Sequence, residues 1–342
     1  MMTRYTLLYS RIFYRAVLTR WKALLPFLLL CACVHELPVG ESDVAVTLHL
    51  QFDYEMPQYK IVEVNSKNAE EATWAYDARY HVWVFQVGPS YDSMADSEKE
   101  AVQRLVFTQE EVAFLERDVT LMMPRGVYEV LVWTDFVPEG SRDDFFWDTT
   151  HPSALTVKPE QLGGNDFRMA YGGRLKVDTR ALLENDSHLE GVVAMERPLA
   201  KFNFVSTDLD EFRQMYGQVD ILTYGVEFAY NGFMASVYNL FKDRTVDSLL
   251  GQHFSSSFTV SEAGEVEMGF DYVLVGTRET SVEMNLALFG PSGESLGGTS
   301  AVFVPLMRSH LTTVRGKFLS GSQAGGVSID PSFEGDLNIH IQ

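Results

Sequence analysis

The feature of this sequence that most restricts its fold is the alternation of apolar and polar residues with a period of two. Between Val44 and Tyr54 every second residue is apolar, which is typical of a strand with one buried and one solvated face. Similar runs follow at 79–87, 119–123, 127–135, 168–177, 199–206, 219–229, 270–275, 282–289, 301–306, 311–319 and 337–341. Eleven or more strands predict an all-β protein made of antiparallel β-sandwiches.

Helical patterns are few and short. Thr108 to Glu111 has the form of a capping box and predicts a helix of one or two turns through Leu115. Ser206 to Phe212 predicts a second capped helix start. Neither pattern keeps an apolar stripe for more than about three turns, so both helices are expected to connect strands rather than to bind a partner helix.

The length of 342 residues is enough for two domains. A polar, turn-rich stretch at 183–188 lies near the middle of the chain that follows residue 32. We therefore expect an N-terminal signal peptide at 1–32, a linker at 33–43, one β-sandwich at 44–190 and a second at 191–342.

The N-terminal segment has the composition of a targeting signal. The first 32 residues contain five basic and no acidic side chains, and an apolar run extends from Ala23 to Leu30. This run is too short to cross a bilayer as a helix, which requires about 20 residues, so a secretory signal peptide is expected.

The end of this segment resembles a bacterial lipobox, because the small residue Ala32 precedes Cys33, whereas Leu30 is too large for the position before Cys31. We expect lipidation of Cys33, which would hold the protein at the outer membrane or cell surface of a Gram-negative envelope. The alternative is an ordinary signal peptide with two incidental cysteines.

Charge excludes one class of partner. The 310 residues after position 32 carry 22 Lys and Arg against 47 Asp and Glu, a net charge of −25. Nucleic-acid binding needs a cationic surface, so no nucleic-acid partner is expected. With Cys33 lipidated, the mature chain has no disulfide and depends on packing for its stability.

Enzyme motifs are absent from the sequence. The eight histidines include no pair spaced three or four residues apart, and there is no GxSxG, GxxxxGK[ST] or GxGxxG motif. Only the abundance of carboxylates supports a hydrolase. We therefore predict no catalytic activity, no cofactor and no metal site.

One loop, 141–152, combines acids and aromatics and is a candidate ligand loop. Its candidate residues are Asp143, Asp144, Phe145, Phe146, Trp147 and Asp148. Such a set can bind Ca²⁺ or stack on a sugar ring. The loop lacks the alternating DxDxDG spacing, which favours a loop whose aromatics pack on the sandwich. The acidic stretch with Asp92, Asp96, Glu98 and Glu100 is expected to be a solvated loop.

Two strands are candidates for pairing with another chain by strand addition, in which main-chain hydrogen bonds complete an open sheet. One is the first strand, from Val44 to Tyr54. The other is the last, where Leu337, Ile339 and Ile341 alternate with polar residues. This last strand is either the edge of the molecule's own sheet or a strand exchanged with a neighbour.

Several segments resemble the fimbrillin-like lipoproteins of the type V pilus superfamily. They are PRGVYEVLVWTDF at 124–136, ERPLAKF at 196–202, FDYVLV at 270–275 and VPLMRSHLTTVRG at 304–316. These segments follow the lipobox in the order found in that superfamily. Together they cover nearly the whole mature chain. The resemblance implies two tandem transthyretin-like sandwiches and a structural or adhesive role, with pilin-like subunits as partners by strand addition. Gly126 is expected to supply a positive φ at a hairpin entry.

The sequence departs from the polymerising members of that superfamily in one respect. Those members are cut after an arginine beyond their first strand, and a neighbour's strand enters the groove. Here no arginine lies between Cys33 and Arg79, and Arg79 falls inside a predicted strand. We therefore expect the first strand to be retained, and the protein to be an anchor, cap or stand-alone surface subunit. The alternative function is a glycan-binding surface lipoprotein for polysaccharide capture. Its platform would be Phe145, Phe146 and Trp147 together with Asp143, Asp144 and Asp148.

Overall fold

The computed structural model describes residues 43–56, 76–110, 115–183, 186–276 and 278–320, together with the backbone of 340–341. The chain divides after Asp43, and the elements below all belong to the unit Val44–Gln342. Strands dominate these residues, and helices are short. The predicted all-β fold with a few short connecting helices is confirmed.

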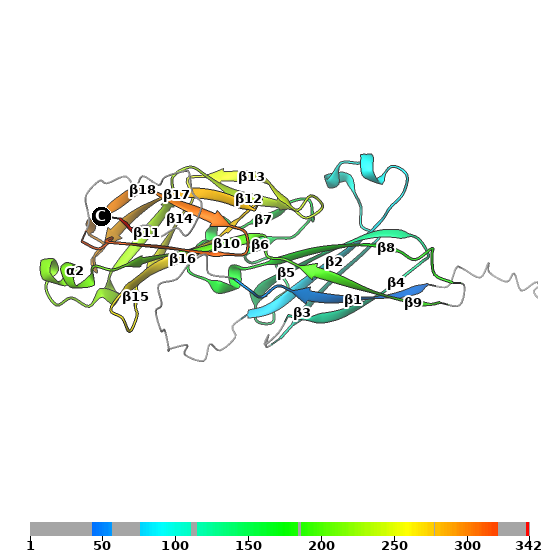
Figure 1. The fold of residues 1–342 in the computed structure, drawn as a ribbon, viewed down its shortest axis with the longest axis horizontal. Coiled ribbons are helices and arrows are strands. Elements are labelled where there is room, and N and C mark those ends of the chain that lie inside the picture. The colour runs from blue at the N-terminus through cyan, green and yellow to red at the C-terminus, as the bar shows by residue number, and fades with distance from the viewer. Residues whose placement is uncertain are drawn as a thin grey trace, which may run out of the picture. The chain divides into compact units, whose positions relative to one another are not determined.

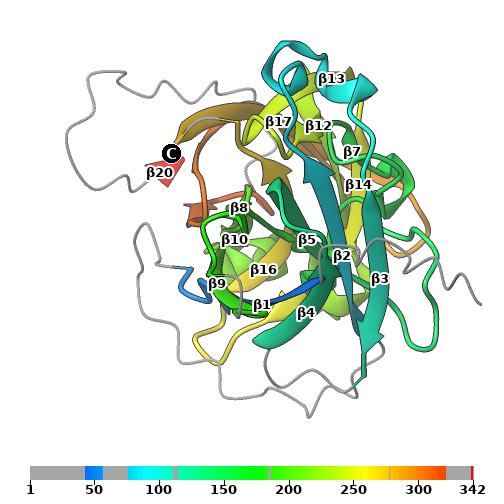
Figure 2. The ribbon, with the colours of Figure 1, turned by 90° about the vertical axis from the view of Figure 1, so that its right-hand side faces the viewer.

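Two sheets from the first half of the unit face each other and are called the first sandwich (Figure 1). The smaller sheet has the order β4-β1-β9, with β1 at Val44–Phe52, β4 at Arg117–Met123 and β9 at His188–Met195. The larger sheet has the order β3-β2-β5-β8, with β2 at Tyr76–Gln86, β3 at Gln103–Gln109, β5 at Val127–Pro138 and β8 at Tyr171–Asp178. β2, β3 and β5 run side by side in Figure 2.

The period-two pattern of β1 places its apolar face in the core. Val44, Val46 and Leu48 have no exposed surface and lie in one cluster with Val82 of β2 and Val130 of β5. Full burial of such a side chain stabilises the fold by about 1.5–3 kcal/mol. The outward residues of β1 are only half-buried or exposed, so the register of β1 is fixed by which face is buried.

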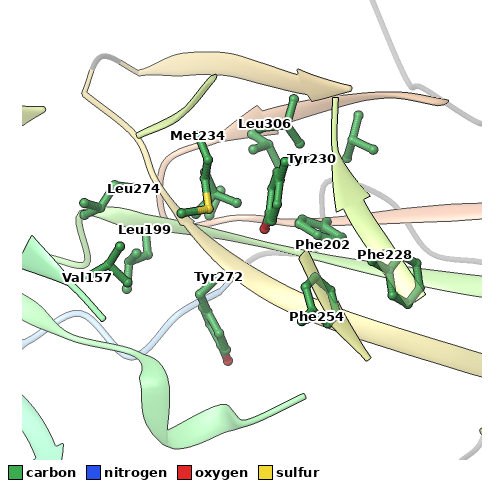
Figure 3. Packing of buried hydrophobic residues seen from close by; sticks show 14 of the residues in the cluster. Val157, Leu199, Phe202, Phe228, Tyr230, Met234, Phe254, Tyr272, Leu274 and Leu306 are labelled. Carbon is green, nitrogen blue, oxygen red and sulfur yellow. The ribbon is translucent and has the colours of Figure 1, made fainter. Parts of the chain in front are cut away.

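A second pair of sheets forms the second sandwich. One has the order β15-β16-β10-β19-β20, with β10 at Leu199–Ser206, β15 at Thr259–Val260, β16 at Val266–Leu274, β19 at Leu311–Gly316 and β20 at His340–Ile341. The other has the order β14-β11-β17-β18, with β11 at Gly225–Tyr230, β14 at His253–Ser257, β17 at Glu279–Phe289 and β18 at Ser295–Met307. Aromatic side chains fill its core, including Phe202, Phe228, Tyr230 and Phe254 (Figure 3).

The two sandwiches repeat one strand order. In the first, β1 lies between antiparallel β4 and parallel β9; in the second, β10 lies between antiparallel β16 and parallel β19. The facing sheets correspond in the same way, because β3-β2-β5-β8 matches β14-β11-β17-β18 in chain order and pairing. Tandem sandwiches are therefore confirmed, and the repeat lies in the topology rather than in a visible sequence period.

A further four-stranded sheet joins the two halves of the chain and is called the bridging sheet. Its order is β13-β12-β7-β6, with β6 at Trp147–Asp148, β7 at Leu155–Val157, β12 at Phe233–Asn239 and β13 at Arg244–Leu250. It packs on the face of β2 and β5 that the first core does not use, through Trp83, Phe85, Leu131 and Trp133. β2 and β5 are consequently buried on both faces.

Of the two predicted helices, one is confirmed and the other is wrong at its start. The α-helix α2 spans Leu209–Tyr216, which confirms the helix predicted from Ser206. The helix predicted from the capping box is wrong at its start, because Thr108 and Gln109 lie in β3 and pair with Arg79 and Ala78; residues 111–114 lie outside the described part. No helix among the described residues has the length and apolarity to span a membrane.

Short 3₁₀ helices replace the ends of two predicted strands. The strand predicted at 168–177 begins only at Tyr171, after η4 at Asp166–Arg168, and the strand predicted at 219–229 begins only at Gly225, after η5 at Ile221–Thr223. In each case an Asn or Asp side chain accepts the amide two residues on and turns the chain. Three more 3₁₀ helices are η1 at Tyr91–Ser93, η2 at Asp96–Glu98 and η3 at Pro159–Gln161.

Two further expectations need revision. Gly126 is not among the residues with positive φ; its amide instead donates to Thr179 Oγ1 at 2.8 Å. The predicted domain boundary at 190/191 falls inside β9, whose residues pair with β1. We therefore propose a boundary in the turn at 196–198, between β9 and β10.

Candidate functional site

The first strand, a candidate for strand exchange, is a central strand. β1 pairs with β4 from Val44↔Met123 to Leu50↔Arg117, and with β9 from Ala45↔His188 to Phe52↔Met195. Both of its edges are therefore occupied along almost its whole length. Removal of β1 would open a groove between β4 and β9 and expose the first core.

The last strand is described only in part. Leu337 and Ile339 lie outside the described residues, and Ile341 belongs to β20, which pairs in parallel with β19 through Arg315↔His340 and Gly316↔Ile341. β20 stands at the edge of its five-stranded sheet. This is the position that the edge-strand interpretation requires, and exchange with a neighbour stays a hypothesis.

The first arginine after Cys33 is buried in an ion-pair network. Arg79 of β2 is 1% exposed and binds Asp135 of β5 with both ends of its fork, Nε to Oδ1 at 2.9 Å and Nη2 to Oδ2 at 2.6 Å. Its Nη1 donates to Asp144 Oδ1 at 2.8 Å and to the Arg142 carbonyl at 3.0 Å. Burial opposes the charge, but these partners outweigh it and raise the pKa of Arg79. Arg79 is a structural cation.

His81 lies beside this network on the same strand. Its Nε2 lies 3.2 Å from Thr149 Oγ1, which in turn donates to Asp144 at 2.7 Å. Burial, together with the nearby charges of Arg79 and Arg104, lowers the pKa of His81 to about 3. The imidazole is therefore neutral in the folded protein at neutral pH.

The candidate ligand loop does not form an aromatic platform. Phe146 and Trp147 are 1% and 0% exposed and belong to the core, with Trp147 Nε1 donating to the Arg168 carbonyl at 3.2 Å. Phe145 is half-buried and packs edge-to-face on Phe146. This arrangement is that of a loop whose aromatics pack on the sandwich.

The three aspartates of that loop have different surroundings. Asp144 joins the Arg79 network, Asp148 accepts from the amide and hydroxyl of Thr150, and Asp143 is exposed. No group of three or more His, Cys, Asp or Glu side chains in the described part of the chain is arranged to hold a metal ion.

The acidic stretch 92–100 is exposed at Asp92, Glu98 and Glu100, as expected, but Asp96 is partly buried. Asp96 binds Lys99 at 2.9 Å, Lys242 at 3.0 Å and Asn239 at 3.0 Å. Partial burial raises the pKa of Asp96, but these three hydrogen bonds outweigh it and lower the pKa to about 2. Asp96 therefore ties the first sandwich to the bridging sheet.

A second buried ion pair was not foreseen from the sequence. Asp271 of β16 is 1% exposed and pairs with Arg168 of η4. It also accepts from Tyr230 Oη at 2.7 Å, the Gly163 amide at 3.1 Å and the Tyr272 amide at 2.8 Å. The sequence signal that could have indicated this ion pair is an aspartate inside the apolar run FDYVLV. This carboxylate fixes the segment 163–168 against the second sandwich.

Residues in the segments that carried the family resemblance meet near the turn between β9 and β10. Arg197 donates to Tyr171 Oη at 2.8 Å and lies 5.0 Å from the centre of that ring. Its carbonyl accepts from Arg308 Nε at 3.2 Å and Ser309 Oγ at 3.0 Å. Lys201 binds Asp166 at 2.6 Å and lies 4.0 Å from the Phe270 ring centre. These residues hold the two sandwiches together.

A family model matches residues 40–342. The chain belongs to DUF6562, a family of unknown function. No curated protein matches this member of DUF6562.

Solved structures share a remote likeness with this DUF6562 protein. The fimbrial anchor protein Mfa2 from Porphyromonas gingivalis has 12% identity and a TM-score of 0.41, over 75% of this chain and 81% of that one. A proposed cell adhesion protein from Bacteroides eggerthii has 12% identity and a TM-score of 0.44, over 87% and 94%. A proposed polysaccharide-binding protein from Bacteroides thetaiotaomicron has 11% identity and a TM-score of 0.40, over 75% and 79%. Such values are too low to assign a function.

Replacement of Arg79 by Met tests the buried network. Arg79→Met leaves Asp135 without its partner at 0% exposure, so we expect the free energy of unfolding to fall by about 3–5 kcal/mol. Urea denaturation measures it. Arg180→Met is the matched control, because its ion pair with Asp178 is exposed, and it should leave stability unchanged. Equal effects of the two substitutions would contradict the assignment.

The neutral state of His81 predicts a pH dependence of stability. A lowered pKa means that the unfolded chain binds a proton from about pH 6.5 downwards while the folded protein does not, so stability is full above pH 6.5 and falls as pH decreases towards 3. Between pH 7 and pH 5 the wild type should lose about 2 kcal/mol more than His81→Gln. Denaturant titrations at both pH values measure this difference, and parallel losses would refute it.

Proposed function

We propose that this protein is a lipid-anchored cell-surface structural or adhesive protein of the fimbrillin-like class, acting as an anchor, cap or stand-alone surface subunit. The lipobox-like end of the N-terminal segment and the four fimbrillin-like segments support the class. Pilin-like subunits are the partners that this class implies.

The observation that carries the anchor or cap role is the burial of Arg79. Cleavage after an arginine requires an accessible, locally unfolded segment, and the sequence has no arginine between Cys33 and Arg79. Arg79 is 1% exposed, lies in a strand paired on both sides and makes four hydrogen bonds. A protease of this specificity therefore has no access to a site that would release β1.

Retention of β1 bears directly on polymerisation. A shaft subunit needs an empty groove for its neighbour's strand, whereas here β1 fills the space between β4 and β9. A subunit with a filled groove can end or anchor a fibre, or act alone, but cannot accept the next strand at that position.

The glycan-binding alternative lacks its platform. It depended on Phe145, Phe146 and Trp147, and two of these rings are buried in the core. A carbohydrate surface needs aromatic faces in contact with solvent. We therefore do not favour polysaccharide capture through this loop.

Lipidation of Cys33, which lies outside the described residues, is tested by Cys33→Ala. The two or three acyl chains of a lipid anchor give durable membrane attachment, so we expect the wild type in the membrane fraction and Cys33→Ala in the soluble fraction. Cys31→Ala is the matched control and should stay with the membrane. Membrane fractionation of Cys33→Ala equal to wild type would overturn the anchoring.

A further inference from the structure

An open groove lies between the bridging sheet and β17. Its larger part, about 320 Å³, is bounded by residues of β12, β13, β16 and β17. A smaller part of about 190 Å³ continues past the turn at Asn231 and Gly232. Phe233, Ser281 and Val282 line both parts, so they form one groove. Its volume lies at the lower end of the range for small-ligand sites, about 300–1,000 Å³.

An exposed aromatic ring stands where the two parts of the groove meet. Phe233 is 70% exposed, more than any other aromatic side chain in the described part of the chain. Its neighbour Met234 belongs to the core of the second sandwich (Figure 3), and strand neighbours point in opposite directions. Phe233 therefore faces outward by the geometry of its strand. Val246, which is 48% exposed, lines the same groove, and exposed apolar surface of this kind marks a binding site.

Polar side chains surround this ring. Asp247 of β13 and Glu283 of β17 supply carboxylates, and Thr245, Thr280 and Ser281 supply hydroxyl groups. A carboxylate oxygen can accept more than one hydrogen bond, and a hydroxyl can both donate and accept. Hydrogen bonds from a hydroxyl to a carboxylate are roughly twice as strong as those between neutral groups. The lining is therefore suited to a ligand that carries several hydroxyl groups.

Contacts within the protein hold both carboxylates at the groove. The Ser248 amide donates to Asp247 Oδ1 at 2.7 Å. The Asn231 side chain donates to the Glu283 carboxylate, and the Asn231 amide donates to the Glu283 carbonyl at 2.8 Å. Asp247 is exposed and Glu283 is half-buried, so solvent and ligands can reach both. A site with its polar groups held in place loses less entropy when a ligand binds.

The combination of an exposed ring with carboxylates restricts the class of ligand. The charged side chains that line the groove are Asp247 and Glu283, both acidic, so an acidic ligand is repelled. A wholly apolar ligand would cover these carboxylates without giving them hydrogen bonds, which is costly. A pyranose sugar meets both conditions, because its C–H face is apolar and can stack on Phe233, while the hydroxyl groups at its edge can donate to the carboxylates.

We propose that this groove binds a short segment of an uncharged oligosaccharide. A pyranose ring stacks on Phe233, and its hydroxyl groups donate to Asp247 and Glu283. This site is separate from the loop at 141–152, where Phe146 and Trp147 are buried. The groove would bind its ligand whether or not Cys33 carries lipid, so the interaction is independent of the anchoring.

The test uses the full-length protein and a panel of hexasaccharides. The neutral ones are built from glucose, galactose, mannose, xylose or N-acetylglucosamine, and the acidic ones from galacturonic or glucuronic acid. Saturation-transfer NMR should detect binding of neutral hexasaccharides, with the strongest signals on the C–H protons of one ring face, because that face stacks on Phe233. Acidic hexasaccharides should bind at least about tenfold more weakly.

Substitutions in the groove separate stacking from general apolar contact. Phe233→Leu keeps an apolar side chain but removes the ring, so the affinity measured by titration should fall at least about tenfold, whereas Phe233→Trp should retain binding. Asp247→Asn should weaken binding about tenfold, because a charge-assisted hydrogen bond becomes a neutral one.

Matched controls exist elsewhere on the surface. Tyr216 of α2 is 44% exposed and Asp92 of η1 is exposed, so Tyr216→Leu and Asp92→Asn should leave the affinity unchanged. Circular dichroism establishes that each variant is folded. Absence of binding by every neutral hexasaccharide, equal affinity for the acidic ones, equal weakening in the controls, or binding that Phe233→Leu leaves unchanged would overturn the proposal. Binding of an extended peptide that depends on Phe233, without oligosaccharide binding, would overturn it as well.

Discussion

The rest of the structure depends on the pairing of β1 between β4 and β9. A parallel neighbour can be joined to β1 only by a long crossover. Here the crossover to β9 contains all the remaining strands of the first sandwich. The last strand of the first sandwich, β9, thus pairs with the first strand, β1, and holds it in the sheet. β10 has the same relation to β16 and β19 in the second sandwich.

A short turn between β9 and β10 connects the two sandwiches. Residues on both sides of this turn are held by hydrogen bonds that cross it, those of Arg197 and Asp271 above all. The bridging sheet adds a second connection, because β6 and β7 come from one half of the chain and β12 and β13 from the other. The two modules are therefore expected to unfold together, since the core cluster of the second sandwich also includes Trp83, Leu131 and Trp133 of the first.

Much of the fold could be predicted from the sequence, because alternation reports directly which strand face is buried. The strand Val44–Phe52 is an example. The helix after Ser206 was predicted from its capping pattern instead. Thr108 was mispredicted because pairing with β2 overrides a local capping pattern. The bridging sheet was missed because its strands belong to different halves of the chain, and no local pattern reports a long-range partner.

The candidate site was less accessible to prediction. Three adjacent aromatics suggest a binding platform, yet only tertiary contacts decide that Phe146 and Trp147 point inward. The ion pairs of Arg79 and Asp271 stand inside apolar runs, where a charged residue indicates a buried partner but does not identify it.

We expect β1 to stay in the mature protein as the middle strand of its sheet. Intact mass measurement of the protein purified from its native membranes tests it most directly. The expected chain begins at a lipid-modified Cys33 and includes Val44–Phe52. A chain whose N-terminus lies beyond Phe52 would contradict it.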